Sequence, residues 1–175
     1  MKNILFLLAL SILLFGCAKK KPATDYMKEA KLGIEQKKIP ETIKTYETLV
    51  NEFPNDSLAP EALYQLGTIY QNKMVPNLNE TQSLEKAVTV FRSVFDRYPD
   101  FKQAQISLFM VGFIQANELK KYQDATAAYN LFLQKYPKSD MAPAAREEVN
   151  NMGLTPEQII SKKEISKDNG KQSGL

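Results

Sequence analysis

The sequence EFPNDSLAPEA at 52–62 returns in closely similar form as KYPKSDMAPAA at 135–145, and a looser copy, RYPDFKQAQIS, stands between them at 97–107. Each copy holds an aromatic residue, a proline directly after it and an alanine five residues beyond that proline. The three prolines, Pro54, Pro99 and Pro137, are 45 and 38 residues apart. Periods of about 20–50 residues are typical of solenoids, in which each unit packs against its neighbours. The sequence therefore predicts a row of repeated units.

An amphipathic helix is predicted before each of the three prolines. Apolar side chains recur there in steps of three and four residues, which places them on one stripe of a helix. Each proline is expected to end its helix, because the residue before a proline is disfavoured in the helical region. The three stripes are Ile43, Tyr46, Val50 and Phe53; Val88, Phe91, Phe95 and Tyr98; and Ala125, Tyr129, Phe132 and Tyr136.

A new helix is predicted to begin a few residues beyond the proline. Asp56 or Ser57 can accept the free amide hydrogens at its start, and Pro60 suits its first turn, where the missing N–H costs nothing. The third copy repeats this arrangement with Ser139 or Asp140 and with Pro143.

The C-terminal region continues the helical pattern for a short distance. A packing helix is expected over 143–152, and Gly153 is expected to end it. The residues TPEQ at 155–158 form a capping box, which predicts the start of a last short helix. Residues 161–175 are polar and free of aromatics, and they are expected to be a disordered tail.

The order of residues within the units resembles the tetratricopeptide repeat, a helical hairpin of about 34 residues. The first unit departs from the pattern at Thr42, where the pattern has alanine, as an end unit often does. The second unit has about eight extra residues around 74–81, and the third has one added residue. The matching residues are Tyr26, Ala30, Ile39, Tyr46, Leu49 and Pro54; Leu63, Leu66, Gly67, Tyr70, Ala87, Phe91, Val94 and Pro99; and Leu108, Val111, Gly112, Ala125, Tyr129, Phe132 and Pro137.

This resemblance implies an all-α solenoid of helical hairpins over residues 25–160, with about three repeats and a capping C-terminal helix pair. Gly67 and Gly112 would let the two helices of a hairpin approach closely. Small side chains would do the same between repeats, at Ala59, Ala87, Ala104, Ala125 and Ala142. The alternative is an unrelated helical bundle in which these are ordinary small residues.

The first sixteen residues, MKNILFLLALSILLFG, place Lys2 before an apolar run from Ile4 to Phe15. A membrane-spanning helix needs about 20 apolar residues, so the run predicts an export signal over 1–16 instead. Leu14 to Cys17 resembles the lipobox of bacterial lipoproteins, which implies cleavage before Cys17 and acyl chains such as palmitate on that residue. The alternative is that Cys17 is a small apolar residue of an ordinary signal.

The residues around Cys17 fit the lipoprotein interpretation. Cys17 is the only cysteine of the chain, so it has no intramolecular disulfide partner. In lipoproteins an aspartate after the cysteine retains the protein in the inner membrane, and here Ala18 favours the outer membrane. We expect residues 17–24 to be the lipidated cysteine with a short, lysine-rich tether, on the periplasmic face of that membrane.

Charge and composition argue against several classes of function. The chain carries a formal net charge of +3, but residues 22–161 include fifteen basic and eighteen acidic side chains. A slightly acidic fold without a basic stripe is a poor nucleic-acid binder, because that affinity comes mainly from neutralising phosphates. Histidine is absent, and so are Gly-rich phosphate loops, G-x-S-x-G and H-E-x-x-H motifs. We therefore expect no enzyme activity, no cofactor and no metal.

The inner surface of a solenoid, formed by the first helix of each repeat, binds peptides or partner proteins. Phe109 and Phe113 are the most informative residues there, because large exposed aromatics are typical binding anchors. The alternative is that the C-terminal helices bury both. Position by position, the resemblance implies a partner-binding groove lined by Tyr64, Thr68, Gln71, Asn72, Phe109, Phe113 and Asn117.

The lipobox together with the aromatic-proline turns is similar to the BamD family, the lipoproteins of the machine that inserts β-barrels into the outer membrane. The resemblance implies a lipid-anchored scaffold that binds envelope proteins or peptide segments in its groove, with membrane contact through Cys17. The chain has fewer repeats than that family usually has. It is also less similar to the coordinator associated with the Tol-Pal system, which generally lacks the lipid.

Two further classes of function stay open. The first is a structural envelope protein without a peptide groove, which predicts a C-terminal segment packed across the inner surface. The second is an enzyme or enzyme accessory of cell-wall metabolism, which predicts a buried cluster of carboxylates in a pocket.

Overall fold

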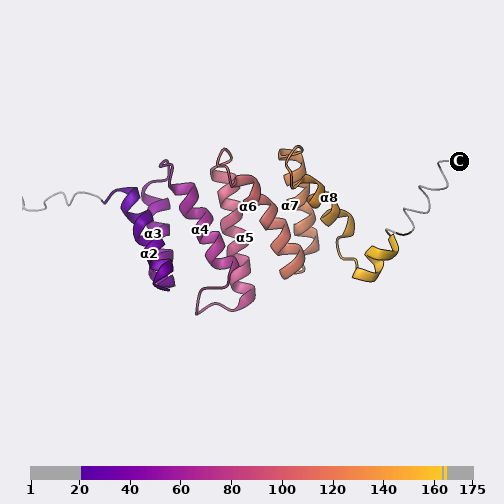
Figure 1. The fold of residues 1–175 in the computed structure, drawn as a ribbon, viewed down its shortest axis with the longest axis horizontal. Helices are drawn as coiled ribbons and strands as arrows, with labels where there is room; N and C mark the ends of the chain where they lie inside the picture. Colours follow the sequence, from indigo (N-terminus) through magenta and orange to yellow (C-terminus); the bar gives the residue numbers. More distant parts are fainter. Residues whose placement is uncertain (1–20, 163, 165–175) are drawn as a thin grey trace, which may run out of the picture.

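The computed structural model describes residues 21–162 and 164, and the regular structure in this part of the chain is helical. Three hairpins follow one another: α2 (Ala23–Glu35) with α3 (Ile39–Glu52), α4 (Ala59–Gln71) with α5 (Glu80–Arg97), and α6 (Ala104–Phe113) with α7 (Tyr122–Lys135). A π-helix, η1 (Ile114–Glu118), extends α6. The helix α8 (Ala142–Asn151) and a short helix at 156–162 complete the row (Figure 1). The predicted all-α solenoid of hairpins is confirmed.

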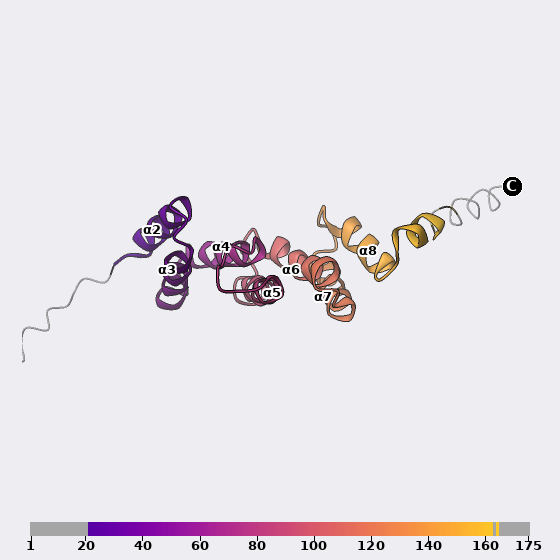
Figure 2. The ribbon, with the colours of Figure 1, turned by 90° about the horizontal axis from the view of Figure 1, so that it is seen from below.

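The hairpins are arranged in two layers. The first helices, α2, α4, α6 and α8, form one layer, and the second helices, α3, α5 and α7, form the other (Figure 2). Each second helix packs against the first helix of the next hairpin as well as against its own partner. The first layer has one side that faces away from the second layer. We call this side, formed by α2, α4, α6 and α8, the A-helix face.

The three aromatic-proline turns have the same backbone structure. Phe53, Tyr98 and Tyr136 follow the helices α3, α5 and α7 with φ of −131°, −134° and −129°, outside the helical range. In each turn the amide three residues later donates to the carbonyl of this aromatic, at 3.0, 3.0 and 3.1 Å. The recurrence in sequence is therefore a recurrence of one stop-and-start turn, as predicted.

The polar side chains of these turns accept hydrogen bonds within the turn, and not from the first turn of the next helix as was expected. Asp56 Oδ1 accepts a hydrogen bond from the amide of Leu58 at 2.8 Å, and Ser139 Oγ accepts one from the amide of Met141 at 3.3 Å. Leu58 and Met141 are the N-cap residues, and neither makes a side-chain cap. The prediction of a helix cap was therefore wrong, because Asp56 and Ser139 close the preceding turn. The prolines of the first helical turn, Pro60 and Pro143, lie as predicted.

Two glycines set the distance between the helices of a hairpin. A Cβ built on Gly67 would lie 2.7 Å from the ring of Phe91, and one built on Gly112 would lie 2.9 Å from the ring of Tyr129. Carbon atoms in contact need about 3.5 Å or more, so a larger residue at either position must displace a buried ring. The predicted role of both glycines is confirmed.

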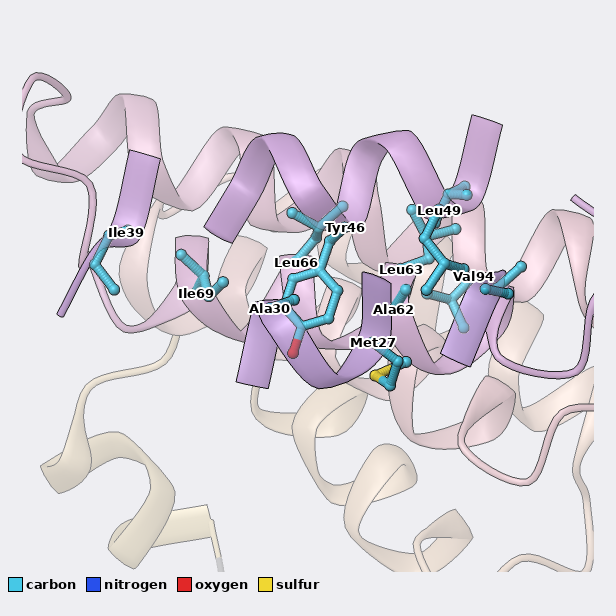
Figure 3. Packing of buried hydrophobic residues seen from close by; sticks show 13 residues of the cluster. Met27, Ala30, Ile39, Tyr46, Leu49, Ala62, Leu63, Leu66, Ile69 and Val94 are labelled. Carbon is cyan, nitrogen blue, oxygen red and sulfur yellow. The ribbon is translucent and has the colours of Figure 1, made fainter. Parts of the chain in front are cut away.

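Three hydrophobic clusters form a continuous core along the row. The first joins α2, α3 and α4 with Val94 of α5 (Figure 3). The second joins α4, α5 and η1 with Ala128 of α7, and the third joins α6, α7 and α8. Each cluster thus spans neighbouring hairpins, as expected where no hairpin can cover its own apolar side. The predicted small residues lie inside: Ala59, Ala87, Ala104 and Ala125 are 0 % exposed and Ala142 is 1 % exposed.

The extra residues of the second and third units have different structures. The third unit takes up its added residue as η1, where the amide of Leu119 donates to the carbonyl of Ile114, five residues earlier, at 3.0 Å. In the second unit, Val75 and Leu78 of the insertion pack against the core. Asn79 then caps α5, with hydrogen bonds of 2.9 and 3.0 Å shared with Gln82. The insertion is therefore a packed part of the fold.

Lysine occupies a strained position in the turn between the two helices of every hairpin. Lys37, Lys73 and Lys120 have φ of 58°, 56° and 55°, a region that glycine enters without steric cost. We expect Lys37→Gly to raise the free energy of unfolding by about 1 kcal/mol, measured by urea unfolding. Lys28→Gly, inside α2, should lower it by about 1 kcal/mol. Equal losses of unfolding free energy in the two variants would show that the backbone at Lys37 is not strained.

The predicted C-terminal helices are confirmed, but the last of them continues through 161–162, where the disordered tail was predicted to begin. Gly153, with φ of 75°, follows α8, and Thr155 and Gln158 exchange capping-box hydrogen bonds of 2.8 and 3.3 Å. The predicted signal, Cys17 and nearly all of the tail lie outside the described residues. Within the described ranges, no helix combines the length and apolar character needed to cross a membrane.

Candidate partner-binding site

The seven residues predicted to line a groove lie on two first-layer helices. Tyr64, Thr68 and Gln71 belong to α4, Asn72 is its C-cap, Phe109 and Phe113 belong to α6, and Asn117 belongs to η1. Since α4 and α6 follow one another in the first layer, both segments contribute to the A-helix face (Figure 2).

Tyr64 and Phe109 occupy equivalent positions and make equivalent contacts. Tyr64 packs against Phe91 with ring centroids 5.7 Å apart, and Phe109 packs edge-on against Tyr129 at 5.3 Å. Phe109 also touches Phe132 at 5.6 Å. Each ring covers the aromatic of its own second helix and stays half-exposed. Both therefore connect the A-helix face to the core, and their role in partner binding stays a prediction.

Phe113 differs from both of them. It is half-exposed and belongs to none of the three hydrophobic clusters formed by the described residues. It stands where α6 passes into η1, and its carbonyl accepts a hydrogen bond from Asn117 Nδ2 at 3.2 Å. A partly exposed aromatic ring outside the core clusters is the feature expected of a binding anchor.

The polar members of the set lie toward the end of each first helix. Thr68 is half-buried, and its Oγ1 donates to the carbonyl of Tyr64 at 3.2 Å. Asn72 and Asn117 are exposed, and each stands close to a strained lysine, Lys73 or Lys120. The structure thus places apolar groups along the middle of the face and carboxamides at its edge.

Ile106 belongs to the same surface, although sequence reasoning missed it. It is half-exposed, lies in none of the clusters described above and precedes Phe113 by seven residues, two turns of one helix. It also lines a hollow of about 610 Å³ with Tyr136 and Met141. Its spacing from Phe113 is the signal that would have found it.

The middle of the A-helix face carries little charge. From Ala104 to Phe113, α6 has no charged side chain, and α4 has only Glu61, which accepts a hydrogen bond from Gln65 at 2.9 Å. In contrast, α5 in the other layer carries exposed Glu80, Glu85, Lys86, Arg92, Asp96 and Arg97. A partner on α4 and α6 would therefore be held by apolar contacts and not by ion pairs.

Two tyrosines of the core have raised pKa values. Burial raises the pKa of Tyr46 to about 12, and burial together with the smaller effect of Glu148 raises the pKa of the Tyr129 hydroxyl. Both phenols are therefore neutral at ordinary pH and poor bases or nucleophiles. In the described residues, no group of three or more His, Cys, Asp or Glu side chains is placed to hold a metal ion.

Comparison with known families agrees with this geometry. Residues 61–100 and 107–139 match the family model of the tetratricopeptide repeat. Two of the hairpins are thus similar to tetratricopeptide repeats. The matched ranges contain nearly all of α4 to α7 and hence most of the A-helix face described above. No curated protein matches the chain.

The first hairpin lies outside the matched ranges and yet has the tetratricopeptide architecture. Its Tyr46 is 1 % exposed and stands eight residues before the proline, as do Phe91 and Tyr129 in the two matched repeats. Stacked tetratricopeptide hairpins generally bind protein partners. The fold is therefore that of a protein-interaction scaffold.

Proposed function

We propose that this chain is a lipid-anchored scaffold on the periplasmic face of the outer membrane, and that it holds partner proteins on its A-helix face during outer-membrane protein assembly. The observation that carries the binding site is the pair of half-buried residues on uncharged α6, Ile106 and Phe113, which are in none of the clusters of the described core. Their surface offers a partner apolar area that the fold itself does not use.

The proposed anchor is supported by the short stretch of chain between the lipobox and the first hairpin. Lys21 precedes α2 and contacts it: its ammonium pairs with Glu29 and lies 4.7 Å from the ring centroid of Tyr26. Cys17 precedes Lys21 by four residues, which span at most about 14 Å of extended chain. A lipid on Cys17 would therefore hold the first hairpin close to the membrane, while the later hairpins extend away from the anchor.

The assembly role rests on the resemblance to the BamD family in its lipobox and aromatic-proline turns. A structural envelope or Tol-Pal-associated protein without a groove would place its C-terminal segment across the A-helix face. The described C-terminal helix at 156–162 lies beyond α8 at the end of the row and not over α4 and α6 (Figure 1). This position favours a face that is open to a partner.

Membrane fractionation tests the anchor. We expect the chain in the outer-membrane fraction, and Cys17→Ser should remove it from that fraction because no acyl chain can then be attached. Ala18→Ser, one residue away, should leave it in the outer membrane. The proposal fails if Cys17→Ser leaves the protein in the outer-membrane fraction.

A further inference from the structure

The C-terminal end of the row contains a cavity of about 320 Å³ between η1 and α8. It exists because α8 is short, with 10 residues where α4 has 13, so that the chain turns away at Gly153 before filling the space beside η1. The helix at 156–162 closes one side and is held to α8 by Lys162, whose ammonium donates to the Asn150 carbonyl at 2.6 Å. We call this space, between η1 and residues 147–159, the C-terminal cavity.

The apolar wall of the C-terminal cavity is unusually open to solvent. Tyr122 is 42 % exposed and Leu154 is 36 % exposed, and half-buried Met152 and Ile159 continue the same wall. A π-helix, a form that appears often at functional sites, provides the opposite side through Ala116.

The polar wall carries an uncompensated negative charge. Glu148 is half-buried, and its carboxylate makes no hydrogen bond or ion pair with any residue that the structure describes. Its charge acts on the buried Tyr129 hydroxyl, which also has no partner among the described residues. Lys120 is the one cation on the described lining, and its ammonium donates to the Asn117 carbonyl at 2.7 Å.

We propose that the C-terminal cavity binds a cationic side chain, arginine or lysine, of a partner segment, with its charged end on Glu148 and its aliphatic stem on Met152 and Leu154. The dimensions suit one such side chain, and long basic residues bury their stems on apolar surface while the charged end finds a carboxylate. The inference rests on the proposed scaffold function, because the cavity is lined by Asn117, one of the residues predicted for the groove, and by α8 of the A-helix face. One partner can therefore reach both.

Methyl NMR of the full chain in detergent, labelled with 13C at the methionine methyl groups, tests the site with N-acetyl-arginine amide as the probe. We expect a saturable shift of the Met152 signal and none at Met27 or Met74, which lie far from the cavity. The neutral analogue N-acetyl-citrulline amide should give no saturable shift. Equal effects of the two probes, or no shift at Met152, would overturn the proposal.

A charge-neutralising pair of variants identifies the carboxylate. Glu148→Gln should weaken binding of the arginine probe at least about tenfold, as expected for loss of a charged hydrogen bond. Glu157→Gln removes a charge from the neighbouring helix without touching the cavity and should leave the affinity unchanged. If the Glu148→Gln variant binds the arginine probe with unchanged affinity, while its Met27 signal shows an intact fold, the inference is wrong. The probe binds without an envelope partner. A negative result with it would therefore contradict the proposed cation site and leave the proposed partner binding on the A-helix face untouched.

Discussion

Phe91→Ala is expected to lower the free energy of unfolding by about 4 kcal/mol, the largest effect of any single change considered for this chain. The ring is 1 % exposed, covers Gly67 and packs against Tyr64. It belongs to the cluster that also holds Val111 and Ile114, so its loss opens a cavity between the second and third hairpins. A folded domain is stable by about 5–15 kcal/mol, and the variant should therefore be close to unfolding at 37 °C. Urea unfolding followed by circular dichroism measures the change.

Phe113→Ala is the matched control, because it makes the same substitution on a half-exposed ring outside the described clusters. We expect it to lower the free energy of unfolding by no more than about 1 kcal/mol. The contact between Phe91 and Gly67 can be tested in the same way. Gly67→Ala should lower the free energy of unfolding less in a Phe91→Leu background than in the natural chain. A loss under about 1 kcal/mol for Phe91→Ala would contradict packing between hairpins as the source of stability.

Phe113→Ala should instead weaken partner binding at least about tenfold, because a buried aromatic anchor contributes most at the centre of an interface. The ring is in none of the hydrophobic clusters of the described residues, and α6 has no charged side chain that could replace it. The measurement is the amount of envelope protein that copurifies with the anchored chain after mild solubilisation, compared with the natural chain at equal expression.

Phe109→Ala separates binding from stability. Phe109 packs against Tyr129 and Phe132 within its own hairpin, so its loss should lower the free energy of unfolding by about 2 kcal/mol. Phe113→Ala should reduce binding with stability nearly unchanged. If copurification follows stability in both variants, the A-helix face around Phe113 is not the partner-binding site.

The features that sequence predicted are those with a local physical cause. Proline at 54, 99 and 137 ends a helix wherever it stands, and the three turns after it are alike in backbone structure. Gly67 and Gly112 were predictable because a close helix contact needs a residue without a side chain, and each faces a ring of the second helix.

Features that depend on the whole hairpin could not be predicted from the sequence. Whether the added residue of the third unit forms a bulge or a longer turn depends on packing, and the structure takes it up as η1. Tyr64 and Phe109 were placed on the groove by position alone, but the contact of each with its own second helix depends on the distance that the glycines set. The insertion after Lys73 gave no sign that Val75 and Leu78 would pack into the core.

Site-specific photo-crosslinking in living cells tests the binding face most directly. A photoreactive amino acid would replace Ile106 or Phe113 on the A-helix face, and Thr89 or Asn130, exposed on the other layer, as matched controls. We predict that one envelope protein is crosslinked from positions 106 and 113 and not from 89 and 130. Crosslinking of the same protein from the control positions, with none from 106 and 113, would contradict a scaffold that binds its partner on the first helices of its repeats.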